Sequence, residues 1–122
     1  MVTKSKAKES SKKANSTQNE LVQLDLSFPA LNKEIENLEK DDLESFFKSL
    51  EKIEVMTWAQ IYATSSKTLR RGLNWEPIQG QTTSDGKQVA SVRITKKFRA
   101  RVVRDGVFMR FISLHPDHDS AY

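Results

Sequence analysis

Two histidines and two aspartates close the chain, in the run His115-Pro116-Asp117-His118-Asp119-Ser120-Ala121-Tyr122. Histidine is the side chain whose ordinary pKa lies nearest neutrality, so it can take up and release protons in general acid/base chemistry. Three interpretations of this tail stay open: an acid/base site, a structural C-terminus in which Pro116 stops a strand, and a metal site. The close spacing across Pro116 works against convergence of both His and both Asp on one metal. We therefore predict neither a metal nor a cofactor.

The residues before this tail predict the strands that hold it. Asp105-Gly106 lies between apolar-rich runs, and Asp-Gly favours a two-residue hairpin turn because both turn residues need positive φ. In that register Arg104 faces Val107, Val102 faces Met109, Ala100 faces Phe111 and Phe98 faces Ser113. Side chains alternate along a strand, so one face of the hairpin is apolar and suited to a core. Its members are Phe98, Ala100, Val102, Met109 and Phe111.

The opposite face of the predicted hairpin is rich in arginine. It carries Arg99, Arg101, Val103, Phe108, Arg110 and Ile112, with Leu114 at its end. Arg101 then lies opposite Arg110, and like charges directly opposite across strands are destabilising. One interpretation is a solvated face with splayed arginines. The other is a face that binds a polyanion, most simply an RNA phosphate backbone, which guanidinium groups engage with two parallel bonds.

Charge is segregated along the 122 residues. Residues 1–19 carry five Lys against one acid, residues 20–66 four Lys against ten acids, and residues 67–122 eleven Lys or Arg against five acids. This asymmetry indicates a half of the domain that faces nucleic acid. Residues 1–19 have almost no bulky apolar side chain, so we expect a disordered basic tail, either solubilising or an arm for phosphates. Residues 20–122 then form one domain.

Composition also indicates where in the cell the protein is expected. The chain has no cysteine, which rules out disulfides and thiolate metal sites and is typical of cytoplasmic proteins. No apolar run approaches the roughly 18 residues of a membrane span, so we expect no membrane association. We therefore predict a cytoplasmic protein.

The rest of the chain predicts helices between an N-terminal strand and the hairpin. Alternation over 22–28 indicates a half-buried strand. Apolar stripes and cap signals then predict helices after Pro29, after a capping box at Asp41 to Glu44, and from Thr57 to about Arg71, before Gly72. Turn residues over 79–88 indicate a loop, with a Ser-Asp-Gly-Lys turn at its tip, and β-branched residues predict a strand over 89–95. The fold class is α+β, with the N-terminal strand and helices packed on an antiparallel sheet in two layers.

The run from Ser91 to Ile112 resembles the end of RelE/ParE-type toxins of bacterial toxin–antitoxin systems. In that family an Arg-bearing strand leads through a short basic turn to an aromatic-Arg pair, and a short tail with His or Tyr follows. The resemblance implies a RelE-like fold over residues 21–122. It implies catalysis by Arg99, His115, His118 and Tyr122. It implies RNA contacts from Arg93, Lys96, Lys97, Arg101 and Arg110.

RelE-like members cleave mRNA, commonly in the ribosome. The resemblance therefore predicts a toxin that is a metal-independent mRNA endoribonuclease, with mRNA, the ribosome and a cognate antitoxin as partners. RNA needs no metal for cleavage when its own 2′-OH attacks the adjacent phosphate, because a base, an acid and cations suffice. One alternative is a non-catalytic RNA- or ribosome-binding module that uses the same arginine face. Another is an interaction protein of the antitoxin or phage-encoded type, which binds through its acidic helices.

Overall fold

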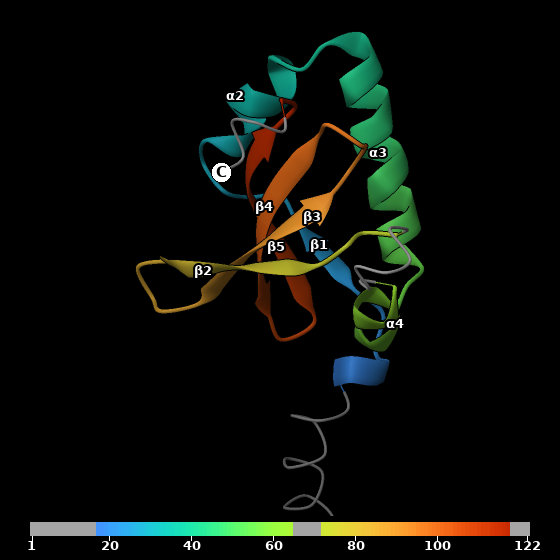
Figure 1. Cartoon of the computed structure of the whole chain (residues 1–122), viewed down its shortest axis with the longest axis vertical. Helices are drawn as coiled ribbons and strands as arrows, with labels where there is room; N and C mark the ends of the chain where they lie inside the picture. The colour runs from blue at the N-terminus through green and yellow to red at the C-terminus, as the bar shows by residue number, and fades with distance from the viewer. Residues whose placement is uncertain (1–16, 65–71, 118–122) are drawn as a thin grey trace, which may run out of the picture.

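A computed structural model of the chain describes residues 17–64 and 72–117, and over these residues the fold is α+β (Figure 1). The elements in order are η1 (Thr17–Asn19), β1 (Gln23–Asp25), α2 (Leu31–Glu36), α3 (Lys40–Glu54), α4 (Trp58–Ala63), β2 (Glu76–Thr82), β3 (Gln88–Arg93), β4 (Arg99–Asp105) and β5 (Phe108–His115). The strands form one sheet in the order β1-β5-β4-β3-β2. The other neighbours are antiparallel, but β1 runs parallel to β5, so the sheet is mixed and not wholly antiparallel as predicted. In these ranges no helix is long and apolar enough to cross a membrane.

The core lies between the sheet and α3, which runs along its side in Figure 1. Phe46 of α3 is fully buried, and its ring centroid lies 6.3 Å from that of Phe98 and 5.7 Å from that of Phe111. The apolar face predicted for the hairpin is confirmed, because each of its members is fully buried: Phe98, Ala100, Val102, Met109 and Phe111. The apolar side chains on one face of α3 and those on one face of the strands therefore pack together in one core.

The register predicted for the hairpin is wrong. The turn residues are Gly106 and Val107, and Asp105 pairs with Phe108. Gly106 has a φ of +64°, whereas Asp105 stays in the strand. A turn that needs positive φ only at its first central residue favours Gly there, which moves the turn one residue along the chain. Val102 consequently pairs with Phe111 and not with Met109.

A β-bulge then shifts the register again between Arg101 and Val102. Beyond it Ala100 pairs with Leu114, and Leu114 is buried in the core, whereas the predicted register had placed it on the arginine face. A bulge inserts one extra residue into one strand, so it turns the residues that follow to the other face. The end of β5 is therefore inverted relative to the prediction.

The loop predicted over residues 79–88 is wrong in its first half. Residues Glu76–Thr82 form the edge strand β2, which pairs with β3. The register shifts between Pro77 and Thr82, where Gly80 has a φ of +80°. Glycine and proline, which read as turn signals, are tolerated in an edge strand with a bulge because one side needs no partner. The turn predicted at Ser84 to Lys87 is confirmed, with Thr83 N–H bonded to the carbonyl of Lys87 at 2.9 Å.

The helix starts show one confirmed prediction and one error. At α4 the Thr57 side chain accepts a bond from Gln60 N–H at 3.2 Å, and the Gln60 side chain accepts one from Thr57 N–H at 2.9 Å. The predicted capping box at Asp41 to Glu44 does not form. α3 begins at Lys40, with Glu39 as N-cap and no side-chain cap. Asp41 and Asp42 instead lie in the first turn, where carboxylates favour the helix dipole. The helix predicted from Thr57 to about Arg71 is too long, because α4 ends at Ala63 with Thr64 as its C-cap; Arg70 and Arg71 themselves fall outside the described residues.

Arg104 is a charged residue on the core side of β4, two residues after the buried Val102. Its guanidinium carbon lies 4.4 Å from the centroid of the Trp58 ring. The same group donates hydrogen bonds to Gln18 Oε1 at 2.6 Å, Thr17 Oγ1 at 2.9 Å and the Tyr62 hydroxyl at 3.0 Å. Arg104 therefore covers the indole and ties η1 and α4 to the sheet.

Candidate functional site

The sheet face opposite α3 carries two neighbouring cross-strand rows of polar side chains. One row joins Arg93, Arg99 and His115 across β3, β4 and β5, and the other joins Ser91, Arg101 and Ser113. We call Arg99, Arg101, Ser113 and His115 the arginine–histidine cluster. Directly opposite side chains in a sheet have Cβ atoms about 4.5–5.5 Å apart, so the four side chains of the cluster are close neighbours.

The bulge between β4 and β5 creates this cluster. Before the bulge Val103 pairs with Arg110, and beyond it Arg101 pairs with Ser113 and Arg99 with His115. Without the extra residue, alternation would have put Ser113 and His115 on the core face, as the predicted register did. The end of β5 is also fixed from the other side, because Leu114 N–H donates to Glu34 Oε1 of α2 at 2.7 Å.

The imidazole and one guanidinium of the cluster are held by specific bonds. His115 Nε2 lies 2.8 Å from Ser113 Oγ. Arg99 donates from Nη1 to the carbonyl of Thr95 at 2.8 Å and to that of Lys96 at 3.4 Å. All four cluster side chains are partly exposed. The cluster is therefore ordered by the protein and still accessible to a ligand.

The like-charge pair predicted between Arg101 and Arg110 does not form, and a different one does. Arg93 lies opposite Arg99, and Arg99 in turn lies opposite His115 in the same row. An acid stands at the end of the other row, where Glu76 of β2 pairs with Ser91. Placing two arginines opposite one another costs a few tenths of a kcal/mol to about 1 kcal/mol, and an anion between them offsets that cost.

Arg110 is bonded to acids of its own protein. Its Nε lies 3.1 Å from Asp25 Oδ2, and its Nη2 lies 3.1 Å from Asp105 Oδ2. Lys87 adds a weaker contact to Asp105 at 3.5 Å. The hydroxyl and N–H of Ser27, followed by Arg110, lower the pKa of Asp25 below its ordinary value, and Asp25 raises the pKa of Arg110. Arg110 therefore joins β1, β4 and β5 and is separated from the cluster.

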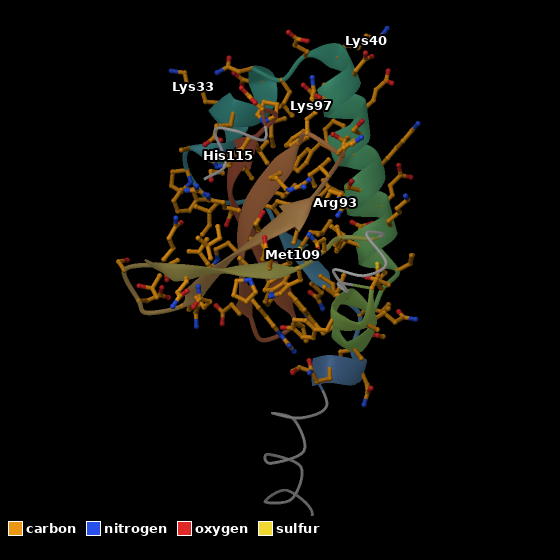
Figure 2. The ribbon with its side chains drawn as sticks, viewed as in Figure 1. Lys33, Lys40, Arg93, Lys97, Met109 and His115 are labelled. Atoms are coloured by element: carbon orange, nitrogen blue, oxygen red, sulfur yellow. The ribbon has the colours of Figure 1, made fainter. Side chains whose placement is uncertain are left out.

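The remaining predicted RNA ligands lie at the same end of the sheet as His115. Figure 2 shows Arg93, Lys97 and His115 around this end, with Lys97 on the connection between β3 and β4. Lys96 and Lys97 are both exposed. Two predicted catalytic residues, His118 and Tyr122, lie outside the described residues.

An open hollow of about 410 Å³ adjoins the end of β5. It is lined by Asn37, Glu39, Asp42, Lys97, Pro116 and Asp117. The amide and carboxylate groups of the hollow can hydrogen-bond to a heterocyclic ring such as a nucleobase. Lys97 lines the hollow and also belongs to the basic end of the sheet. Within residues 17–64 and 72–117, no three His, Asp or Glu side chains are grouped closely enough to hold a metal ion.

No family model, curated protein or solved structure matches this chain. Sequence reasoning missed Ser113, which it had placed opposite Phe98 on the core face. A serine two residues before a histidine on one strand is a signal that could have identified it, because such residues share a face.

Proposed function

We propose that this chain is a RelE-like toxin that cleaves mRNA through the arginine–histidine cluster. The observation that carries the proposal is the pairing of His115 with Arg99 and of Ser113 with Arg101 on one partly exposed face. A proton-transfer group beside two cations, one of them held by bonds to the backbone, suits a phosphodiester, whose charge grows as it reacts. The order of strand, helices and antiparallel strands supports the RelE-like assignment.

In the proposed reaction the RNA supplies its own nucleophile. The 2′-oxygen attacks the adjacent phosphorus, the bond from phosphorus to the 5′-oxygen breaks, and a 2′,3′-cyclic phosphate and a 5′-hydroxyl result. A base takes the proton of the 2′-OH, and an acid gives one to the leaving 5′-oxygen. His115 fills one of these roles, and His118 or Tyr122 fills the other. Arg99 and Arg101 stabilise the charge on the phosphate.

The proposed partners follow from the same surface. The exposed Lys96 and Lys97 extend the cations of the cluster and suit the backbone of mRNA, alone or in the ribosome. Asn37 and the acids of the adjoining hollow can bond to the edge of an unstacked base. A cognate antitoxin completes the proposed module and would keep the toxin inactive.

A second candidate is an RNA- or ribosome-binding module without cleavage. It is favoured by the fact that, within the described ranges, the cluster has two arginines but a single imidazole. Phosphate contacts need only the cations, whereas cleavage needs both an acid and a base.

The two candidates differ in the products that they predict. Purified protein incubated with a single-stranded RNA in EDTA should yield fragments that end in 2′,3′-cyclic or 3′-phosphate, because the proposed reaction uses no metal. Mass spectrometry of the fragments reads these ends. Intact RNA that stays bound to the protein, with and without ribosomes, would favour the binding module and reject the nuclease.

Arg101 and Arg110 should respond differently to the same substitution. Arg101→Gln should weaken RNA binding and lower the slope of log affinity against log salt by about 1, because one phosphate contact is lost. Arg110→Gln should leave this slope unchanged and lower the free energy of unfolding by up to about 1 kcal/mol, because its ion pairs are partly exposed. Salt titrations of RNA binding and urea unfolding measure the two effects. Equal salt slopes in the two variants would contradict the assignment.

A further inference from the structure

Ser113 and His115 form a hydrogen-bonded pair on the exposed side of β5. They are two residues apart on one strand, so their side chains leave the sheet on the same face. The distance from Ser113 Oγ to His115 Nε2 is 2.8 Å, typical of a well-formed hydrogen bond. Neither the composition of the tail nor the resemblance to RelE-type toxins had singled out Ser113.

The backbone of this pair is fixed on both sides. Ser113 and His115 pair with Arg101 and Arg99 of β4. The residue between them, Leu114, is buried, and its N–H donates to the carboxylate of Glu34. The strand therefore cannot shift easily, and the main freedom left at His115 is rotation of its side chain.

The hydroxyl of Ser113 restricts that rotation. A partly exposed imidazole on a strand can adopt several rotamers, and the broad torsion of its ring lets either nitrogen point to one place. A hydroxyl group can donate or accept, so it can hold Nε2 in either protonation state of the ring. The bond selects the ring orientation in which Nε2 lies beside Ser113 and His115 stands across from Arg99.

We propose that Ser113 is a positioning residue, which holds His115 Nε2 and thereby aligns the imidazole with the guanidinium groups of β4. Its effect on RNA cleavage rests on the proposed function, whereas the alignment itself is a property of the free protein. Ser113 forms no covalent bond in this scheme. It fixes the direction from which His115 exchanges a proton with the phosphate-bound RNA.

The chain offers a matched control for the test. Ser91 lies in the same cross-strand row as Ser113, on the other side of Arg101. Ser91→Ala deletes a hydroxyl from the same row at a buried position away from His115, so any general effect of losing a serine hydroxyl should be at least as large there. Ser113→Thr keeps a hydroxyl at the position and is well tolerated in a strand. Full-length wild-type protein and the variants Ser113→Ala, Ser113→Thr and Ser91→Ala form the set.

Two measurements test the alignment and its consequence separately. In nitrogen-15 NMR spectra of the free protein, the His115 Nε2 resonance should move in Ser113→Ala and stay in place in Ser91→Ala. In RNA cleavage, Ser113→Ala should lower kcat about 10–100-fold with KM within twofold, because phosphate binding by the arginines is intact while the proton donor or acceptor is misplaced. Ser113→Thr should keep the Nε2 resonance near its wild-type position and retain most of the wild-type kcat.

The outcomes keep this inference apart from the proposed function. An Nε2 resonance that is the same in wild type and Ser113→Ala overturns the alignment, whatever the RNA does. A moved resonance with unchanged kcat overturns its role in cleavage. If the wild-type protein does not cleave RNA, the nuclease proposal fails, and the NMR comparison alone still decides whether Ser113 positions His115.

Discussion

His115→Ala should lower the rate of RNA cleavage about 10²–10⁴-fold, the usual loss when one catalytic acid or base is removed. The side chain is partly exposed at the end of β5, so its loss leaves the core intact and circular dichroism should stay native. RNA binding should change little, because Arg99 and Arg101 remain. Single-turnover cleavage with saturating protein measures the effect, and growth arrest on induction gives the same answer in cells.

His118→Ala is the informative comparison for this prediction. If the two histidines share the acid and base roles, each variant should lose cleavage and growth arrest. Loss of cleavage and growth arrest in His118→Ala alone would mean that Ser113 and His115 have only a structural role. Full toxicity in both variants would reject the acid/base assignment and favour binding through the arginines. Deletion of residues 1–19 also removes Thr17 and Gln18, which bond to Arg104, but it should leave toxicity largely in place, since the cluster lies outside this segment.

The sequence predicted the faces of the central hairpin correctly although it predicted the wrong turn. The observed pairing of Val102 with Phe111 differs from the predicted pairing with Met109 by two residues. Because side chains alternate with a period of two, an even shift leaves every side chain on its face. The core could therefore be predicted from the alternation of apolar residues alone.

The site could not be predicted in the same way, because it depends on a shift of the strand register by an odd number of residues. The bulge beside Arg101 adds one residue and turns Ser113 and His115 toward the arginines. No residue type marks a bulge of this kind as clearly as Asp-Gly marks a turn, so local sequence signals could not place it. Sequence reasoning did select Arg99, Arg101 and His115, which the observed register places in neighbouring rows.

Charge alone also could not predict which arginines bond to distant parts of the chain. Arg110 is bonded to Asp25, which is 85 residues away in sequence, and Arg104 is bonded to Thr17 and Gln18. These pairings come from the parallel contact of β1 with β5 and from the docking of η1, and neither is local. Arg99 and Arg101 lie on the same face of the sheet as Arg110, but they pair with His115 and Ser113 at the far end of β5.

Phe46→Ala should lower the free energy of unfolding by about 3–5 kcal/mol, a large share of the stability of a domain of this size. Phe46 is fully buried, and its ring packs near Phe98, just before β4, and Phe111 of β5. Truncation removes the transfer free energy of the ring and leaves a cavity that the rigid sheet cannot fill. Urea unfolding followed by tryptophan fluorescence measures the loss.

Phe47→Ala provides the control on the neighbouring residue of the same helix. Phe47 is 47% exposed, so its truncation removes less buried surface and opens no closed cavity. The gain in helix propensity from Phe to Ala is the same in both variants, and it therefore cancels in the comparison. We expect a loss below about 1 kcal/mol for Phe47→Ala. Similar losses of stability in the two variants would mean that α3 does not pack Phe46 against the sheet. The packing of α3 behind β4 and the cluster would then be wrong.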